Sequence, residues 1–250
     1  MTAILAHAIR FADLWAVDHH RMVDEIYSPA IHMESMGRLD RPPVESGQQL
    51  HELEDRLAAM IPEHRHELVR VVAGTDHACL ETTVVSPTTG EYAPACVWWW
   101  MDRRGQVAEE VGFFDWTRRT TDGRRSHGFV PPSPNLAPAN TGGSAVLLDA
   151  LANGDLAAQL SPGCVVEAVG IGPNQLPSGP LELQETVADG AVVAALVLGR
   201  SGSEVWRATL VMTLGEAGVV SVRQYREQSA SFSITDVHPG IRLDRHPPPG

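Results

Sequence analysis

Two side chains in one short apolar stretch have the types and spacing for acid–base chemistry. The stretch is Ile31-His32-Met33-Glu34, and Gly37 follows it. In an extended strand successive side chains alternate between faces, so His32 and Glu34 share a face. A carboxylate in an apolar pocket has a raised pKa and suits a general base, which a neighbouring imidazole can orient. The competing interpretation is that this face meets solvent or a partner domain.

The glutamate of this stretch occurs a second time in the chain. Glu167 follows Val165 and Val166, and a Ser-Pro pair precedes both glutamates at the same distance. Internal repeats of this kind point to repeated structural units. The second copy has Val165 in place of the histidine, so a structural role for the repeated glutamate competes with a catalytic one. We predict that His32 with Glu34 is the catalytic pair.

The elements that would position these residues can be predicted from periodicity and turn residues. Apolar spacing predicts one helix, or two with a bend, over 3–25, and another helix over about 47–60 that Ser46 caps. Alternating apolar residues and intervening turns predict strands over 26–36, 66–73, 77–85, 91–101 and 106–116.

The second copy has a similar order of elements but is shorter. A helix is predicted over 145–159, followed by the strand that carries Glu167, and a closing strand over 219–225. Only nine residues separate Gly179 from Asp189, whereas the corresponding part of the first copy includes a whole helix. We therefore expect the second copy to lack that helix and a strand segment.

Pro, Gly and charge distribution divide the chain into four parts. The first domain is predicted over 1–116, and a Pro- and Gly-rich linker over 117–144. A second, degenerate domain follows over 145–230. Residues 231–250 lack a clear period and are predicted to be a loosely packed tail.

This arrangement resembles the SnoaL-like polyketide cyclase and ketosteroid isomerase superfamily, which has the cone-shaped fold of nuclear transport factor 2. The resemblance lies in Leu-Asp-Ala-Leu-Ala-Asn-Gly-Asp-Leu at 148–156 and Gly-Val-Val-Ser-Val-Arg-Gln-Tyr at 218–225. In the first copy, residues 61–67 and 105–115 resemble the Pro-acidic stretch and the final strand of the family. It implies an α+β fold of two tandem cone-shaped domains, each with helices on a strongly curved antiparallel sheet, the second truncated.

The resemblance also implies roles for two carboxylates. In the isomerases of this superfamily the base follows the first strand just before a glycine, which corresponds here to Glu34. The cyclases keep a catalytic aspartate at the end of an apolar strand face, and Asp115 has that position. Asp115 could equally be the first residue of the linker.

Further residues are predicted to line the first pocket. Trp99 faces opposite to Trp98 and Trp100 on its strand, and at least one of these rings should reach the cavity. His66 belongs to a His-x-His pair that could hold a metal, although an exposed turn is the favoured interpretation and no metal site is predicted. The predicted lining residues are Trp15, His20, Glu63, His66, Glu81, Trp99, Glu109 and Phe113.

Composition excludes several function classes. A net charge of −12 argues against binding to nucleic acid or to an anionic membrane. The chain contains no lysine, which excludes Schiff-base chemistry and a lysine-bound pyridoxal cofactor. Three widely spaced cysteines within apolar runs are expected to be reduced. No segment suggests a transmembrane helix or a signal peptide, and a cytoplasmic location is expected.

These observations predict a cofactor-free acid–base enzyme that acts on an apolar small molecule in the first domain. Isomerisation, cyclisation and lyase-type cleavage all require a desolvated carboxylate to move a proton. Opening of an epoxide by Glu34 and Asp115 is one alternative, and a non-catalytic binding or scaffold protein is another. The two domains are expected to pair within the chain, with a homodimer as a further alternative.

Overall fold

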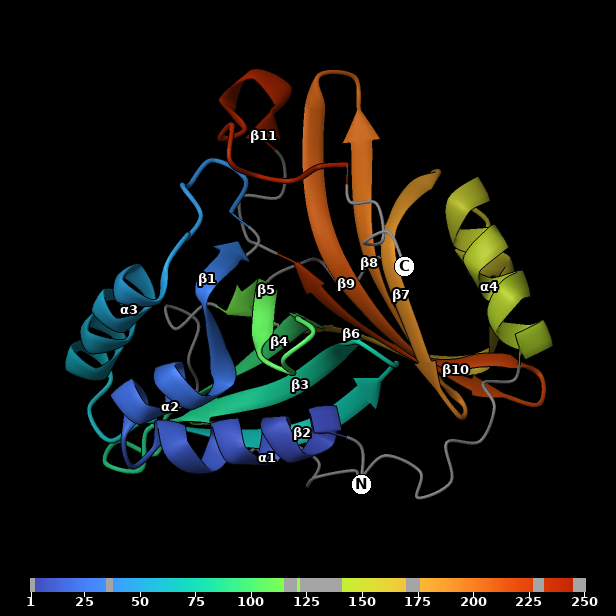
Figure 1. Ribbon diagram of the computed structural model, residues 1–250. Helices are drawn as coiled ribbons and strands as arrows, with labels where there is room; N and C mark the ends of the chain where they lie inside the picture. The colour runs from blue at the N-terminus through green and yellow to red at the C-terminus, as the bar shows by residue number, and fades with distance from the viewer. Residues whose placement is uncertain are drawn as a thin grey trace. The chain divides into compact units, whose positions relative to one another are not determined.

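The chain forms two compact units in the computed structural model, which describes residues 3–34, 38–114, 121, 141–169, 176–226 and 232–244. Unit 1 comprises residues 1–36 and 43–134, and unit 2 comprises residues 37–42 and 135–250 (Figure 1). The short segment 37–42 therefore belongs with the second unit, whereas the first domain predicted from the sequence, 1–116, included it.

Unit 1 contains a five-stranded sheet in the order β1-β5-β4-β3-β2. Neighbouring strands are antiparallel except for β1 and β5, which are parallel. The strand ends lie within two residues of the predicted ends because the turns between them contain Gly, Pro and Asp. The strands are β1 (Tyr27–Glu34), β2 (Arg65–Ala73), β3 (His77–Val85), β4 (Tyr92–Met101) and β5 (Val107–Phe114).

Three helices accompany this sheet: α1 (Ala3–Trp15), α2 (His19–Ile26) and α3 (Gly47–Met60). The N-terminal segment therefore forms two helices, and Asp18 caps the second by accepting a hydrogen bond from the backbone N–H of Arg21. Ser46 caps α3 in the same way, as predicted. Helix α1 lies across β2 and β3 (Figure 1).

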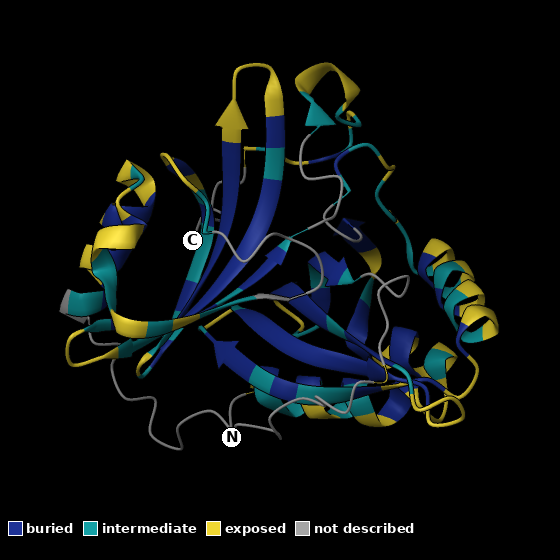
Figure 2. Ribbon diagram, turned by 180° about the vertical axis from the view of Figure 1, so that it is seen from behind, coloured by how far each residue is buried: buried dark blue, intermediate teal, exposed yellow. Residues whose placement is uncertain are grey.

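The core of unit 1 lies between the helices and one face of the sheet. We call the sheet face that carries Leu80, Val97 and Trp99 the helix face, because these side chains join buried residues of α1 and α2 in one cluster. Trp98 and Trp100 point to the opposite face. Figure 2 shows that β3 and β4 are buried along almost their whole length.

Unit 2 contains a sheet with the order β6-β10-β9-β8-β7, and β6 and β10 are parallel. Both the strand order and the single parallel pair therefore match those of unit 1. Helix α4 (Thr141–Asn153) and the 3-10 helix η2 (Leu156–Gln159) precede the sheet. The strands are β6 (Leu160–Val169), β7 (Leu181–Asp189), β8 (Val192–Ser201), β9 (Glu204–Gly215) and β10 (Gly218–Arg226).

Three sequence predictions for unit 2 are wrong. Strand β7 takes the place that β2 has in unit 1, so no strand is missing and only the connection before it is shorter. Helix α4 begins at Thr141, inside the predicted linker. The predicted loose tail is instead packed as far as it is described: β11 (Phe232–Ser233) pairs with β9, and Ile241 packs with Leu198 and Val205. The 3-10 helix η3 (Ile234–Asp236) follows β11.

Two further predictions concern cysteines and membranes. Cys79, Cys96 and Cys164 are all free, and the first two are buried side by side on β3 and β4 with their sulfur atoms 3.5 Å apart. Within the described ranges, no helix has the length and apolar character needed to cross a membrane.

Candidate active site in unit 1

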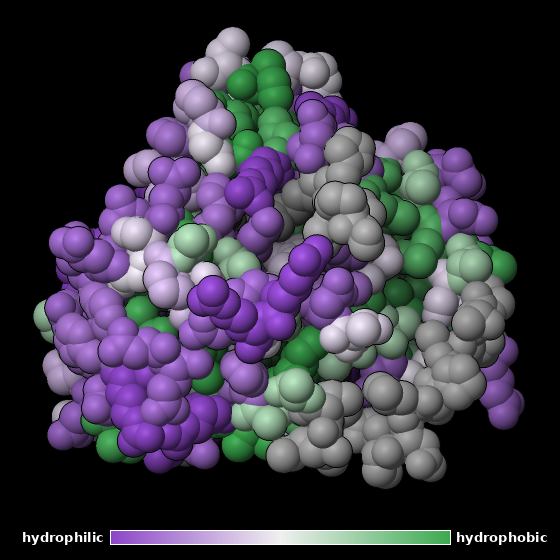
Figure 3. Space-filling model, in the orientation of Figure 1, coloured by the Kyte–Doolittle hydropathy of each residue, from purple (hydrophilic) through white to green (hydrophobic). Residues whose placement is uncertain are grey.

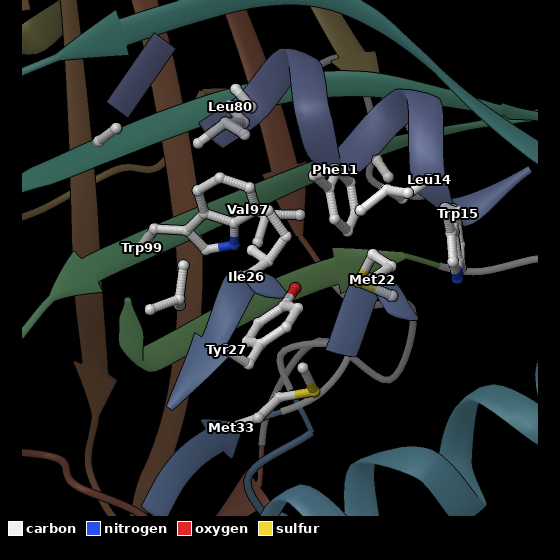
Figure 4. Close-up of a cluster of buried hydrophobic side chains, with 14 of the residues drawn as sticks. Phe11, Leu14, Trp15, Met22, Ile26, Tyr27, Met33, Leu80, Val97 and Trp99 are labelled. Atoms are coloured by element: carbon white, nitrogen blue, oxygen red, sulfur yellow. The ribbon is translucent and has the colours of Figure 1, made fainter. Parts of the chain in front are cut away.

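Glu110 is a buried carboxylate on the helix face of the sheet. An irregularity in the pairing of β4 with β5 at Trp100 and Met101 places Val107 and Glu110 on the same face although they are three residues apart. The Tyr27 hydroxyl donates a hydrogen bond of 2.7 Å to Oε2 of Glu110, and Nε1 of Trp99 donates one of 2.9 Å to the same oxygen. Figure 4 shows the Tyr27 hydroxyl and the Trp99 nitrogen pointing towards the same region.

The second oxygen of Glu110 is available to a ligand. Oε1 makes no hydrogen bond to any residue in the described part of the chain. Gly112 is the next residue on the same face of β5, and a Cβ there would lie 3.6 Å from Oε1. Because residue 112 is glycine, no side chain from this position covers Oε1.

Glu54 is a second buried carboxylate, and it comes from α3. It lies one helical turn after Leu50, on the side of the helix that packs into the core, and is 6% exposed. Nε1 of Trp15, in the last turn of α1, donates a hydrogen bond of 2.5 Å to Oε2 of Glu54. Both buried carboxylates thus receive hydrogen bonds from aromatic side chains.

Burial sets the ionisation of both carboxylates. Desolvation raises the pKa of Glu110 to about 7, although the hydrogen bonds from Tyr27 and Trp99 oppose the rise. Desolvation raises the pKa of Glu54 to about 8, and the nearby charge of Glu110 adds to the rise. Between these values Glu110 is mainly ionised and Glu54 mainly protonated, which is the pairing that a general base and a general acid require. Burial also raises the pKa of Tyr27, so its hydroxyl stays protonated.

Two histidines of β2 and the turn before it face the same interior. Nδ1 of His66 is 3.1 Å from the hydroxyl of Thr82, and its ring centroid is 3.3 Å from that of Trp15. Burial lowers the pKa values of His64 and His66, so both rings are neutral near pH 7. The expectation of an exposed turn here is wrong, because Trp15 packs against both rings.

Three of the predicted lining residues meet in this interior, namely Trp15, His66 and Trp99. Two others do not. Glu63 is exposed in the turn before β2 with φ of 58°, and it accepts a hydrogen bond from Thr88. His20 lies on the surface of α2.

The predicted catalytic pair forms, but on the opposite face of the sheet. Nε2 of His32 lies 3.1 Å from Oε1 of Glu34, and both side chains are buried. Their neighbours Ile31 and Met33 belong to the core beneath the helices, so alternation turns His32 and Glu34 away from Glu110.

Three other predicted lining residues also lie on the opposite face: Glu81, Glu109 and Phe113. Glu81 is fully buried there, with Nε of Arg70 3.6 Å from Oε2. Asp115, predicted as the second catalytic carboxylate, lies outside the described residues.

The sequence predictions missed Tyr27, Glu54 and Glu110. Glu54 left a signal, because it interrupts the apolar face of α3 one turn after Leu50. Glu110 left none, since simple alternation along β5 places it with the residues turned away from Val107. Only the pairing irregularity reverses its direction.

A groove of about 460 Å³ opens between α2, the start of β1 and the first turn of α3. Its volume is within the usual range for small-molecule sites. Tyr27 lines this groove and also donates a hydrogen bond to Glu110, which is not itself a lining residue. The lining residues are Val23, Asp24, Tyr27, Ser28, Pro29, Ser46, Gly47, Gln48 and His51.

The equivalent positions in unit 2 are all apolar. The strand pairings put Leu160 where unit 1 has Tyr27, and Val222 where it has Glu110. Met212 pairs with Val222 just as Trp99 pairs with Glu110. Leu181 and Val197 likewise correspond to His66 and Thr82.

Comparisons with known proteins give only remote structural similarity. No family model and no curated protein matches the sequence. A proposed isomerase of the SnoaL-like family from Agrobacterium tumefaciens aligns with 46% of this chain and 99% of its own, at 16% identity and a TM-score of 0.40. A Mycobacterium tuberculosis protein in complex with estradiol-17beta-hemisuccinate aligns with 48% of this chain and 99% of its own, at 9% identity and a TM-score of 0.41. Such values identify neither the reaction nor the ligand of this protein.

Proposed function

We propose that unit 1 is an acid–base enzyme that acts on an apolar small molecule without a cofactor. The observation that supports this most is Glu110, a buried carboxylate with a pKa of about 7 that is held by Tyr27 and Trp99 and has one free oxygen. In this proposal the substrate enters from the groove that Tyr27 lines.

Each buried group has a role in this proposal. Oε1 of Glu110 removes a proton from a carbon next to a carbonyl group, while Tyr27 and Trp99 hold Oε2 and fix the carboxylate. Glu54 in its protonated form donates a proton or hydrogen bond to the oxygen on which negative charge develops. Isomerisation, cyclisation and lyase-type cleavage share this first step, and the aromatic walls around it suit a flat apolar substrate.

Unit 2 supplies an internal argument that these groups are not needed for folding. The same sheet is built there with leucine, methionine and valine at the equivalent positions. Burying a carboxylate costs free energy, because the charged form loses its hydration. Strongly perturbed carboxylates that the fold does not require are candidates for function.

Deuterium exchange provides the direct test. A panel of apolar cyclic ketones is incubated with the protein in D₂O, and mass spectrometry follows exchange at the carbon next to the carbonyl. We expect Glu110→Gln to slow the exchange by about 10²- to 10⁴-fold, the usual contribution of a general base. Glu109→Gln is the matched control, since the neighbouring side chain lies on the opposite face, and it should leave the rate unchanged.

The pH profile and a third variant separate the alternatives. The rate should rise as Glu110 ionises near pH 7 and fall above about pH 8 as Glu54 loses its proton. If Glu34→Gln abolishes exchange and Glu110→Gln does not, the His32–Glu34 pair is the catalytic site and the assignment to the helix face is wrong.

A non-catalytic binding protein is the second candidate, and the volume of the groove favours it. In that case an apolar fluorescent probe should bind to unit 1 equally well in the wild type and in Glu110→Gln, and no ketone of the panel should exchange. Loss of exchange without loss of probe binding in Glu110→Gln would instead support the enzyme.

A further inference from the structure

Five ligand-type side chains converge on the surface of α2 and α3. We call them the histidine cluster: His19, His20, Asp24, His51 and Asp55. The Asp18 cap starts α2, so that His19 and His20 lie in its first turn. His51 and Asp55 lie one turn apart on the adjacent helix α3. Hydrophilic side chains gather over these two helices in Figure 3.

Two imidazoles meet the same carboxylate oxygen. Nε2 of His19 and Nε2 of His20 each lie 2.9 Å from Oδ1 of Asp55. The three ligand atoms lie within 4.8 Å of one another. Among the described residues, His19, His20 and Asp55 are the group of three His, Cys, Asp or Glu side chains that is close enough to hold one metal ion. Although His19 and His20 are adjacent on α2, both reach Asp55 because it approaches from another helix.

A relay of hydrogen bonds extends from His20 away from Asp55. Nδ1 of His20 is 2.9 Å from Nδ1 of His51, and Nε2 of His51 is 3.0 Å from Oδ1 of Asp24. Together with the contact to Asp55, these three contacts need three protons. Two neutral imidazoles carry only two, so the three contacts can all form when a cation occupies one of them or when one ring carries a second proton.

We propose that His19, His20 and Asp55 bind a divalent transition-metal ion of the Zn²⁺ type. A metal ion would lie between Nε2 of His20 and Asp55. His20 would then donate its Nδ1–H to His51, and His51 its Nε2–H to Asp24. Metal-bound histidines commonly donate their other N–H to such a partner.

The spacing and ligand types agree with this ion. Ligand atoms about 2.0–2.1 Å from zinc in a tetrahedral site lie about 3.3 Å apart. The observed separations of 2.9 Å and up to 4.8 Å bracket that value, so small side-chain rotations are sufficient. Two imidazoles and a carboxylate suit Zn²⁺ and also Ni²⁺ or Cu²⁺. Three protein ligands leave a coordination position open to water or to a ligand oxygen.

The proposed metal site adjoins the groove. Asp24 and His51 belong both to the relay and to the lining of the groove beside Tyr27. A ligand in the groove would therefore lie close to the metal-holding side chains. None of its ligands is one of the buried carboxylates, although Asp55 directly follows Glu54 on α3, and its occupancy can be measured without any substrate.

Calorimetric titration tests the proposal. Full-length protein without an affinity tag is dialysed against EDTA, then against buffer, and titrated with ZnCl₂. We expect one Zn²⁺ per chain, with an affinity that falls at acidic pH because protons compete for the imidazoles.

Variants identify the ligands. His20→Gln and Asp55→Asn should each lower the affinity by more than about tenfold, and His51→Gln, which removes the partner of His20, by about 10- to 100-fold. Asp76→Asn is the matched control, because Asp76 is equally exposed and lies 2.9 Å from a single histidine, His77. It should bind Zn²⁺ like the wild type.

A spectrum provides an independent measurement. Co²⁺ in place of Zn²⁺ should give the intense visible absorption of a four-coordinate ion, and His20→Gln should lose it. The proposal is overturned if the wild type binds no stoichiometric Zn²⁺, or if Asp55→Asn and Asp76→Asn bind it equally well. Because the substituted side chains lie at the surface, we expect every variant to fold. Circular dichroism of each variant checks that unfolding is not the cause of lost binding.

Discussion

Units 1 and 2 have sheets of the same strand order, but the side chains buried against the two sheets differ in chemistry. The strand order and the parallel pair agree, and the side chains can be matched one by one through the strand pairings. Beneath its helices unit 1 buries the carboxylates Glu54 and Glu110 and several aromatic rings, whereas the described buried cluster of unit 2 consists of aliphatic residues and methionine. The three matched pairs at the centre are Tyr27 and Leu160, Trp99 and Met212, and Glu110 and Val222.

This difference shows that the fold tolerates both kinds of interior, but only with matching partners. Glu110 is accommodated because Tyr27 and Trp99 reach its oxygen, and Glu54 because Trp15 does. In unit 2 the equivalent side chains offer no hydrogen-bond donor. A carboxylate there would be buried without a partner.

The largest expected difference between the units is in the pH dependence of their free energy of unfolding, because unit 1 contains the buried carboxylates Glu54 and Glu110. Because burial raises the pKa values of Glu54 and Glu110, the folded state holds protons that the unfolded state releases above about pH 4.5. The free energy of unfolding should therefore fall as the pH rises from about 4.5 to 8, and then level off. Glu54 should account for roughly 5 kcal/mol of this fall and Glu110 for roughly 3 kcal/mol.

Urea unfolding at pH 5 and pH 9, followed by tryptophan fluorescence, measures this dependence. Glu110→Gln and Glu54→Gln should each flatten the profile and be more stable than the wild type at pH 9. Glu109→Gln, on the opposite face, should keep the slope of the wild type. An unchanged slope in Glu54→Gln and Glu110→Gln would contradict the assignment of these carboxylates.

The second test places a carboxylate in unit 2. Val222→Glu puts one at the position of Glu110, between Val166 and Met212 of the neighbouring strands, and should lower the free energy of unfolding by about 3 kcal/mol at pH 8. Val220→Glu is the control, since Val220 is 39% exposed on the same strand. Thermal unfolding should show a large shift for Val222→Glu and almost none for Val220→Glu. Equal shifts would show that unit 2 tolerates a buried carboxylate without donors.

The smallest expected effect on stability comes from replacing a glycine in each unit, because the space beside Gly199 is filled and the space beside Gly112 is not. A Cβ at Gly199 would lie 2.1 Å from the ring of Trp206, and the guanidinium of Arg226 lies 4.0 Å from the centre of that ring. Gly199→Ala should therefore displace the ring and destabilise unit 2 by about 2 kcal/mol. Gly112→Ala in unit 1 meets only Glu110 Oε1 at an ordinary contact distance, so chemical denaturation should show little change. If Gly199→Ala left the stability unchanged, the ring of Trp206 would have to move aside without cost.

Much of the fold could be predicted because its signals are local. The ends of β2 and β3 follow from apolar alternation and from turn residues next to them in the sequence. Glu34 and Glu167 lie at corresponding places, since each is on the edge strand that runs parallel to its neighbour, β5 or β10. The strand β7 was missed because the shorter connection before it was taken as the loss of an element.

The site could be predicted only in part because its geometry depends on distant residues. Alternation correctly placed His32 and Glu34 on one face, and Trp99 opposite to Trp98. It could not tell which of the two faces the helices cover. The residues next to Glu110 in the sequence gave no indication that its side chain faces the core, because a single irregularity of the strand pairing decides this.

The sequence by itself thus determined where most helices and strands lie and which neighbouring side chains share a face, since both properties depend on residues close together in the chain. The tertiary structure alone decided which acids are buried and how they ionise. The partner of Glu110 is Tyr27, 83 positions away, and the partner of Glu54 is Trp15, 39 positions away. A pKa depends on what surrounds a group in space, and only the packing of α1, α3 and the sheet brings those surroundings together.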